Sequence, residues 1–310
     1  MVRYVGLGKE SSFASAASIA RYVDPVTFSL TPEKEPVIFR TVASRSPVTF
    51  YEGKVTVTGD IEIPLYPDVL GDFLLMLLGK VETSQPDAGS APNTYKHTFT
   101  PIEKWESPVT YTLELGEDVI ARRILGAILE SLSLELTPGE PPRAGCSVLA
   151  VKEESTSLGS PTFPSVKAFP ENSATLTLNG ASAELQALSL DINNNPSTDH
   201  HVIGSKYLTR HELGDLEITG SFDVKLADRT HLDQFLSDGE GSLEIMLEGE
   251  EIEAGYKHYL KISLPRIIYS GWEAEVSGSE PIVQSIDFAA IKPSDSPIIT
   301  IELQNKISSY

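Results

Sequence analysis

The sequence predicts a mainly β protein made of two tandem antiparallel β-sandwich or β-barrel domains, each with one flanking α-helix. The first observation behind this prediction is a strand-then-helix unit at residues 53–79 that returns at residues 214–239. The second is the tripeptide Tyr95-Lys96-His97, which recurs 161 positions later as Tyr256-Lys257-His258. Because a shared register over forty residues rarely arises by chance, the sequence indicates an internal duplication.

The first unit begins as a strand and continues as a helix. Apolar and polar residues alternate from Val55 to Leu65, which is the period of a half-buried strand. Gly59 interrupts this strand and indicates a bend, a bulge or a close backbone contact. The apolar residues then follow helical spacing from Pro67 to Leu78, and Gly79 ends the helix.

The second unit repeats this pattern. Its strand runs over residues 216–226, and Gly220 takes the place of Gly59. A second helix is expected over residues 228–237, because Asp228 can cap it and Gly239 can end it. We therefore expect two equivalent helices in two separate sheet systems.

Residues 1–23 are rich in Gly, Ser and Ala, and we expect an N-terminal arm with little core of its own. The first domain is predicted over residues 24–153. A loop is expected at residues 82–93. Strands are expected at residues 26–30, 37–39, 48–51, 55–65, 97–99, 109–115, 119–125 and 129–136.

The first copy is predicted to carry an insertion. Glu140-Pro141 and Ala150-Val151-Lys152 resemble Glu280-Pro281 and Ala290-Ile291-Lys292, but at a shift of 140 and not 161. An extra segment of that difference must lie between His97 and Glu140 in the first copy. The simplest candidate is a hairpin over residues 108–123 that turns at Gly116-Glu117-Asp118.

A linker is predicted over residues 154–173, where Pro161, Pro164 and Pro170 limit regular structure. The second domain follows over residues 174–292, and Asn179-Gly180 near its start is typical of a type I′ hairpin turn. Residues 293–310 are expected to form a C-terminal strand and tail. Further strands are expected at residues 175–178, 183–192, 242–247, 259–264, 267–272, 282–291 and 297–303.

Charge and composition limit the function. The chain has a formal net charge of −20 and a pI of about 4.7, so its surface repels nucleic acid phosphates. The longest apolar run, residues 73–78, is too short to cross a bilayer, and the N-terminus does not suit a signal peptide. We therefore expect a soluble protein made in a cytoplasm. The single cysteine, Cys146, is expected to be a small buried thiol.

No pattern predicts an enzyme, a cofactor or a metal. Asp199-His200-His201 with His211 is the one histidine cluster, and a solvated loop explains it better than a metal site does. The segments 238–241 and 248–253 are expected to be a helix-ending turn and an acidic surface turn. Walker, dinucleotide-binding and serine-hydrolase motifs are absent from the sequence.

Taken together, several segments resemble tail tube proteins of long-tailed, siphovirus-like bacterial and archaeal viruses. They are Gly6 to Phe13 (GLGKESSF), the Thr58-Gly59 strand that leads into Pro67-Asp68-x-x-Gly71-x-x-Leu74, the strand end Ser189 to Asn194 (SLDINN), and the inserted hairpin. The resemblance implies a structural virion protein whose strands close a barrel around a channel for viral DNA.

Two domains in one chain depart from the usual single tube domain. The resemblance and the duplication together imply homotrimeric rings with pseudo-sixfold symmetry, stacked into a helical tube in the virion tail and assembled in the host cytoplasm. Expected partners are further copies of the chain, a tape-measure protein, and tail terminator or tip proteins. Viral DNA should pass without specific binding, because an acidic wall offers its phosphates no cations.

Tube assembly also requires edge strands that neighbours complete. We expect self-assembly residues in the inserted hairpin and the C-terminal strand, although the hairpin face could equally fold back onto its own domain. These residues are Val109, Tyr111, Leu113, Leu115, Ile298, Ile299, Ile301 and Leu303.

Two other functions stay open at this stage. The inner tube of a contractile injection or secretion machine shares the fold, and only a sheath partner or genomic neighbours would separate it. A carbohydrate-binding β-sandwich is the second alternative. Such a module would show clustered aromatic residues, whereas Trp105 and Trp272 are isolated in the sequence.

Overall fold

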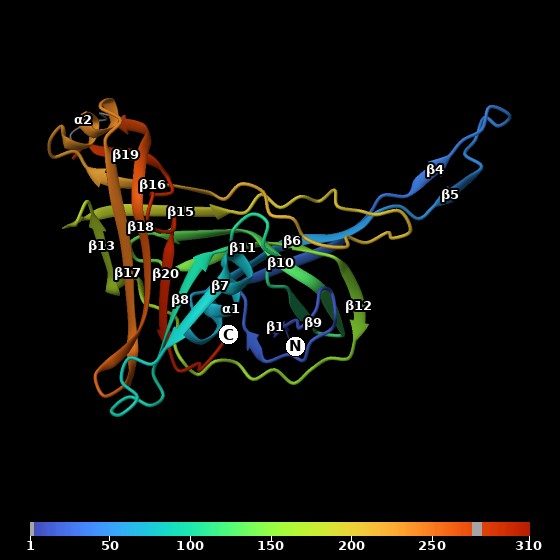
Figure 1. The fold of residues 1–310 in the computed structure, drawn as a ribbon, viewed down its shortest axis with the longest axis horizontal. Helices are drawn as coiled ribbons and strands as arrows, with labels where there is room; N and C mark the ends of the chain where they lie inside the picture. The colour runs from blue at the N-terminus through green and yellow to red at the C-terminus, as the bar shows by residue number, and fades with distance from the viewer. Residues whose placement is uncertain (1–2, 275–280) are drawn as a thin grey trace.

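The computed structural model describes residues 3–274 and 281–310 and is built from antiparallel strands with two α-helices (Figure 1). Residues 275–280, which include Glu280 of the expected repeat, lie outside the described part. The first half contains β1 (Arg3–Lys9), β2 (Arg21–Val23), β3 (Thr27–Lys34), β4 (Val37–Phe39), β5 (Thr49–Tyr51), β6 (Val55–Pro64), α1 (Pro67–Leu78), β7 (Gly79–Ser84), β8 (Tyr95–Pro101), β9 (Tyr111–Glu117), β10 (Ile120–Leu136), β11 (Arg143–Ala150) and β12 (Lys152–Thr156). The second half contains a 3-10 turn (Glu171–Ser173), β13 (Ala174–Leu178), β14 (Ala181–Ser182), β15 (Leu185–Asn193), β16 (Glu217–Lys225), α2 (Thr230–Leu236), β17 (Glu240–Glu253), β18 (Tyr256–Ala274), β19 (Val283–Ala290) and β20 (Thr300–Asn305).

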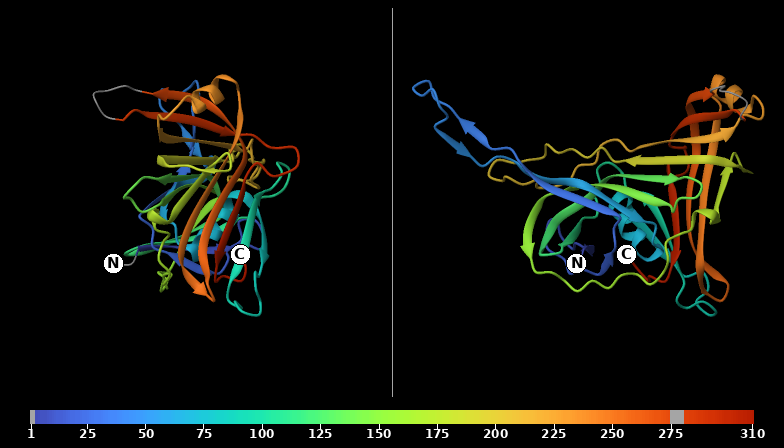
Figure 2. Two further views of the ribbon diagram at one scale, coloured as in Figure 1. Left: turned by 90° about the vertical axis from the view of Figure 1, so that its left-hand side faces the viewer. Right: turned by 180° about the vertical axis from the view of Figure 1, so that it is seen from behind.

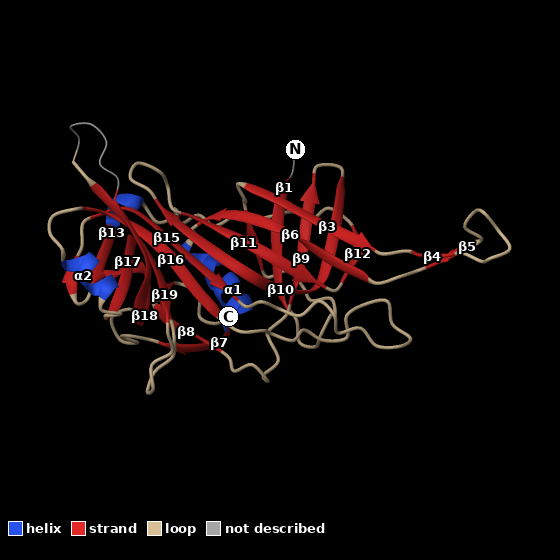
Figure 3. Ribbon diagram, turned by 90° about the horizontal axis from the view of Figure 1, so that it is seen from above, coloured by secondary structure: helices blue, strands red, loops and turns tan. Residues whose placement is uncertain are grey.

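The central feature is a sheet of eight strands that draws four from each half. Its order is β3-β6-β11-β10-β15-β16-β19-β18, and every neighbouring pair is antiparallel. The top view shows these strands running side by side across the molecule (Figure 3). We refer to it below as the central sheet.

The two halves of the central sheet have matching registers. Leu30 pairs with Gly59 in the first half, and Leu190 pairs with Gly220 in the second. A Cβ on Gly59 would lie 1.8 Å from the Ser29 carbonyl oxygen, and one on Gly220 would lie 2.3 Å from the Ser189 carbonyl oxygen. The predicted close backbone contact at Gly59, whose φ is +154°, is therefore confirmed.

A β-bulge falls at the same place in both halves. The β10–β11 register shifts between Leu129 and Ser131, and the β18–β19 register shifts between Tyr269 and Gly271. Each residue of the second bulge is 140 positions after its counterpart in the first. Because a bulge fixes the local bend and twist of a strand, both halves curve at an equivalent position.

The sheets of the two halves are joined, so the expectation of two separate sheet systems is wrong. β10 pairs with β15 at the centre of the central sheet. On the other side, β20 lies between β18 of the second half and β8 of the first. Neither β10 nor β8 ends as a free edge at these places, because a strand of the other half satisfies its backbone groups.

The two helices follow equivalent strands but differ in burial. α1 packs its apolar residues into the core, and Gly79 ends it in the left-handed conformation at φ +82°, as expected. α2 is shorter, starts two residues after Asp228, and leaves Leu236 exposed. Strands of both halves and the C-terminal residues cover α1, and in the described part of the chain α2 has no such cover.

The first half also contains a smaller sheet of five strands, in the order β2-β1-β9-β10-β12. The expectation of an N-terminal arm without a core is wrong for residues 3–9, because the interior of β1 is fully buried between β2 and β9. The glycines and small residues of this segment permit close packing. Gly8, for example, lies against the Ser18 carbonyl.

One hairpin projects from the body of the molecule. β4 and β5 form a separate two-stranded ribbon on the stem of β3 and β6, at the right of Figure 1 and at the left of the rear view in Figure 2. We call residues 36–52 the arm. Its stem is narrow, since a Cβ on Gly53 would lie 1.6 Å from the Glu35 carbonyl oxygen.

Most predicted strands are present, with several corrections. The two strands expected at residues 259–264 and 267–272 are one long strand, β18, and residues 248–253, expected as an acidic surface turn, are the end of strand β17. β7 occupies the start of the expected loop after α1, and β11 was missed because its core positions carry small residues such as Ala144 and Cys146. The two strands expected over residues 119–136 are one long strand, β10, and the expected linker begins with strand β12. The turn at Asn179-Gly180 has positive φ at both residues, as the type I′ prediction requires.

Candidate functional site

One face of the central sheet is the strongest candidate for a functional surface. Along each strand, every second side chain points into the core and the side chains between them point to the other face. Residues directly opposite each other on neighbouring strands share a face, so these outward-pointing side chains lie together across the sheet. We call it the polar face. Its hydroxyl residues are Thr27, Ser29, Thr31, Thr56, Thr58, Ser131, Ser133, Ser147, Ser189, Thr219, Ser221 and Ser285.

The polar face is also acidic. Its carboxylates are Glu33, Asp60, Glu62, Glu135, Asp191, Glu217, Asp223, Glu273 and Asp287. Arg143 and Lys225 are its two cations, so the formal charge of the face is 2 − 9 = −7. Acidic residues come from both halves of the chain and are spread across the sheet.

Local contacts hold the side chains of this face in place. Arg143 Nη1 donates to Glu62 Oε1 at 3.1 Å, so one of the two cations is already paired with a carboxylate. Ser147 Oγ donates to Asp60 Oδ1 at 2.6 Å, and the Ser189 and Ser221 hydroxyls lie 3.0 Å apart. A groove on this face is lined by several of the same side chains, including Glu135. The surface is thus polar, and its one arginine is already paired with a carboxylate.

The predicted self-assembly residues of the inserted hairpin lie inside the fold. Tyr111, Leu113 and Leu115 are 0% exposed, because they pack into the hydrophobic core, and both edges of β9 are occupied, by β1 and by β10. Val109 packs against the same core. In the folded chain this hairpin is not a surface for another subunit, and the alternative that it folds back onto its own domain is correct.

The C-terminal strand gives the same result. Ile299, Ile301 and Leu303 are 0% exposed, and Ile298 packs against the core. Both edges of β20 are occupied, one by β18 and one by β8. This strand completes the sheet of its own chain, so the prediction that a neighbour completes it is wrong.

Other edges lie open instead. Among the described residues, β3 forms a ladder only with β6, and the 271–274 part of β18 forms a ladder only with β19. These strands are the two ends of the central sheet. Sequence reasoning missed both, because an open edge depends on which strands pair and not on the composition of the strand itself.

The arm is the most exposed apolar element of the described chain. Its two strands are exposed at every position. Single solvated apolar residues are ordinary, but a contiguous group on a ribbon of this kind marks an interaction surface. The exposed group consists of Val37, Ile38, Phe39, Val42, Val48, Phe50 and Tyr51.

The histidine cluster does not form a metal site in the described residues. His200 Nδ1 lies 3.4 Å from Glu212, whereas His211 is buried elsewhere and its Nε2 donates to the Gly126 carbonyl at 2.6 Å. No group of three His, Cys, Asp or Glu side chains in the described part of the chain is placed to hold a metal ion. Cys146 is 1% exposed, and burial raises the pKa of its thiol.

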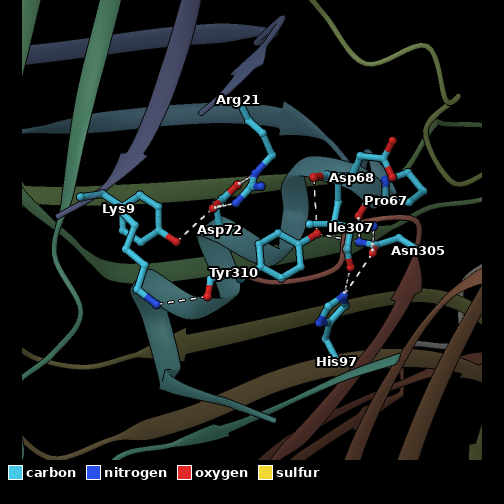
Figure 4. A network of polar contacts seen from close by, with 10 residues as sticks. Lys9, Arg21, Pro67, Asp68, Asp72, His97, Asn305, Ile307 and Tyr310 are labelled. Carbon is cyan, nitrogen blue, oxygen red and sulfur yellow. Dashed lines mark hydrogen bonds and ion pairs between the residues drawn. The ribbon is translucent and has the colours of Figure 1, made fainter. Parts of the chain in front are cut away.

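A buried polar network around α1 is the one place that resembles a catalytic cluster (Figure 4). The Asp72 carboxylate accepts hydrogen bonds from Arg21 Nε and from Arg21 Nη2, the latter at 2.6 Å. The Tyr111 hydroxyl donates a third hydrogen bond to it at 3.0 Å. Burial raises the pKa of the Tyr111 phenol, and the charge of Asp72 adds to this effect. Since Asp72 is buried and both of its carboxylate oxygens already accept hydrogen bonds, the network has a structural role.

The same network fixes the last residues of the chain on α1. Asn305 Nδ2 donates to the Pro67 carbonyl at 2.7 Å, and His97 Nε2 donates to the Ile307 carbonyl at 2.8 Å. The Tyr310 ring lies against Gly71, where a Cβ would come within 2.2 Å of it. Gly71, part of the resemblance, is therefore a docking position for Tyr310.

No helix in the described residues is long and apolar enough to span a membrane. A search among curated proteins found no match to this chain. A family model described as "Phage tail tube protein" matches residues 2–290, which covers both halves of the central sheet and the smaller sheet. The chain therefore belongs to the phage tail tube protein family.

Proposed function

We propose that this protein is the major tail tube subunit of a long-tailed virus, that it assembles into stacked rings, and that the polar face lines the channel through which DNA leaves the capsid. The observation that carries the proposal is the central sheet itself. Its one side is apolar and buried, whereas its other side is polar, acidic and continuous across both halves.

The chemistry of the polar face suits a conduit for DNA. A polymer of phosphates slides past a wall only if the wall does not hold it, and phosphate binding depends on lysine and arginine side chains. The face has nine carboxylates against two cations, and Arg143 is paired with Glu62. Serine and threonine hydroxyls keep the wall hydrated without adding positive charge.

We further propose that the chain arose by duplication of one tube domain, and that a ring contains three chains with pseudo-sixfold symmetry. The equal registers at Gly59 and Gly220 and the bulges at Leu129 and Tyr269 support this. A closed ring of heterologous contacts needs identical junctions, and each chain supplies two units of four strands. Three chains then supply the same number of units as a hexamer of single-domain subunits.

Electron microscopy of the purified protein tests the proposal. Fibres with a central channel are expected, and mass measurement of an isolated ring should give three chains. Monodisperse monomers under all assembly conditions would contradict the tube, and six chains per ring would contradict the trimer. The tape-measure and terminator proteins remain proposed partners, to be tested by copurification from virus particles.

A sheath partner would reassign the protein to the inner tube of a contractile machine, which would keep the role of the polar face. The carbohydrate-binding alternative finds no support at the tryptophans. Trp105 stands alone at 84% exposed, and Trp272 donates its indole N–H to Gln284 at 2.8 Å.

A further inference from the structure

The junction between the two halves of the chain can be compared, residue by residue, with the open ends of the central sheet. At this internal junction, β10 of the first half pairs with β15 of the second, with Leu134 opposite Leu190 and Ser133 opposite Asp191. β10 is the last strand of the first four-strand unit, and β15 is the first strand of the second unit.

Both members of this junction have counterparts that lie at the open ends of the central sheet. Leu190 pairs with Gly220 as Leu30 pairs with Gly59, so β3 corresponds to β15. Leu132 pairs with Cys146 as Trp272 pairs with Ile286, so the end of β18 corresponds to the end of β10. Because the β-bulges of the two strands lie 140 positions apart, each residue at the end of β18 corresponds to the residue of β10 that is 140 positions earlier.

We infer that β3 of one copy pairs in antiparallel fashion with residues 271–274 of β18 in a second copy, in the register of the internal junction. This inference rests on the proposed ring assembly and gives it a specific interface. The correspondence places Leu30 opposite Ala274, Thr31 opposite Glu273, Pro32 opposite Trp272, and Glu33 opposite Gly271.

The open edges suit this partner. Backbone groups of an open edge strand favour pairing with another strand, and β3 and the end of β18 are the two ends of the central sheet that have no further strand partner in the described chain. On the β3 edge the Leu30 carbonyl accepts Arg122 Nη1 at 2.9 Å, and a carbonyl oxygen has a second lone pair for a strand partner. The polar and apolar faces also stay continuous across the junction, because Thr31 and Glu273 both belong to the polar face. Pro32 stands where the internal junction has Ile192, and it donates no hydrogen bond, so the junction between copies has one bond fewer there.

Disulfide trapping tests the register. The hydrogen bond from Asn194 N to the Glu130 carbonyl, at 2.8 Å, sets the alternation of the internal ladder and makes Ser133 and Asp191 a non-hydrogen-bonded pair. Such pairs have Cα atoms about 4.5 Å apart, within the range that a disulfide can bridge. The corresponding pair across two copies is Thr31 and Glu273.

The test variant is Thr31→Cys with Glu273→Cys, oxidised after assembly. Within one chain the two positions lie on the first and last strands of the eight-stranded central sheet. Their Cα atoms are roughly 30 Å apart, so any disulfide between them joins two copies. We expect the monomer band on a non-reducing gel to be lost in favour of dimers and larger products. Cys146 is 1% exposed and adds little background.

Two further variants make the result decisive. In Glu33→Cys with Glu273→Cys both side chains lie on the same face, but the register sets them on a diagonal about 7–8 Å apart, too far for a disulfide. Ser133→Cys with Asp191→Cys should form an intrachain disulfide and confirms that the oxidation works.

The inference is overturned if tubes form and the internal pair is oxidised while the Thr31 and Glu273 pair stays reduced, or if the diagonal pair is trapped equally well. The proposed tube function would stand in both cases. If the unmodified protein forms no rings or tubes, the proposed function fails instead.

Discussion

At the scale of single residues, Glu10 shows why the N-terminal segment is part of the core. Its buried carboxylate accepts hydrogen bonds from Thr110 Oγ1 at 2.7 Å, Thr112 Oγ1 at 2.9 Å, and the Ala14 and Gly126 N–H groups at 2.9 Å each. These four donors come from three separate segments of the chain. Glu10 therefore ties the segment after β1 to β9 and to the middle of β10.

Replacing this residue tests that role. Glu10→Ala leaves four donors without their acceptor, and we expect the free energy of unfolding to fall by about 3–5 kcal/mol. Thr110→Val removes one donor only and should cost about 1 kcal/mol. Urea denaturation of both variants measures the difference, and a loss below that of Thr110→Val would show that Glu10 is not the anchor.

Buried histidines make stability depend on pH. Burial lowers the pKa of His97, His211 and His258 below the ordinary value of 6.5. As pH falls below about 6.5, the unfolded chain binds protons that the folded chain does not, so stability decreases until the folded-state pKa values are reached. At higher pH this contribution is fully present.

His211→Gln should therefore flatten the pH dependence. The variant keeps a side-chain donor for the Gly126 carbonyl but loses the titrating ring. The measurement is the urea midpoint at several pH values between 7.5 and 5.0, and we expect a smaller fall in the variant than in the unmodified protein. An unchanged fall would assign the dependence to the other histidines.

At the scale of elements, the burial of β9 decides what removing residues 108–123 should do. β9 lies between β1 and β10 with its apolar side chains fully buried, so a Gly-Ser linker in its place would expose the core of the smaller sheet. We expect loss of cooperative unfolding or insolubility. Circular dichroism during thermal unfolding measures this, and a folded monomer that fails to assemble would restore the assembly role.

Removing the arm should have the opposite effect. Residues 36–52 contribute no buried side chain, and Glu35 and Gly53 already lie together at the stem, so a short Gly-Ser linker can replace the arm without disturbing β3 and β6. We expect an unchanged melting temperature and a loss of long tubes, because the exposed apolar ribbon has no cover in the single chain. Electron microscopy decides this, and long tubes of normal length would exclude the arm from assembly.

The elements also show how far sequence reasoning reaches. The period-2 strand and the helix of residues 55–78 were predicted closely, because alternation, Pro67 and Gly79 are local signals. β11 was missed, since its small core residues give a weak pattern. The burial of β9 and β20 could not be predicted, because β9 depends on β1, more than 100 residues away in the chain, and β20 depends on β8, more than 200 residues away.

The candidate site follows the same division. Sequence alone gave the acidic balance of the chain but not the residues that share one face, because these come from eight strands whose order is set by long-range pairing. The repeat of 161 positions was the signal that could have located the open edges. It becomes informative only when the internal β10–β15 junction is known.

At the scale of the whole molecule, the polar face makes a prediction about DNA. The unmodified protein should give no gel shift with duplex DNA at moderate salt, because the face carries a net charge of −7. Changing Asp60, Glu62 and Asp287 to Lys should create binding that weakens steeply with salt. The same change to Lys at the exposed Glu82, Glu184 and Glu251, which lie outside the polar face, is the control. Equal binding by both variants would show that the polar face has no special place in the tube.

The position of β20 between β8 and β18 has a consequence for biosynthesis. β8 leaves the ribosome about 200 residues before β20 does, so this link between the halves cannot form while those residues are being made. Contacts of such high sequence separation slow folding, because the closure of a long loop precedes the gain from pairing. Each chain thus completes this part of its sheet only after residues 300–305 have been made, and until then the backbone groups of β8 that face β20 have no strand partner.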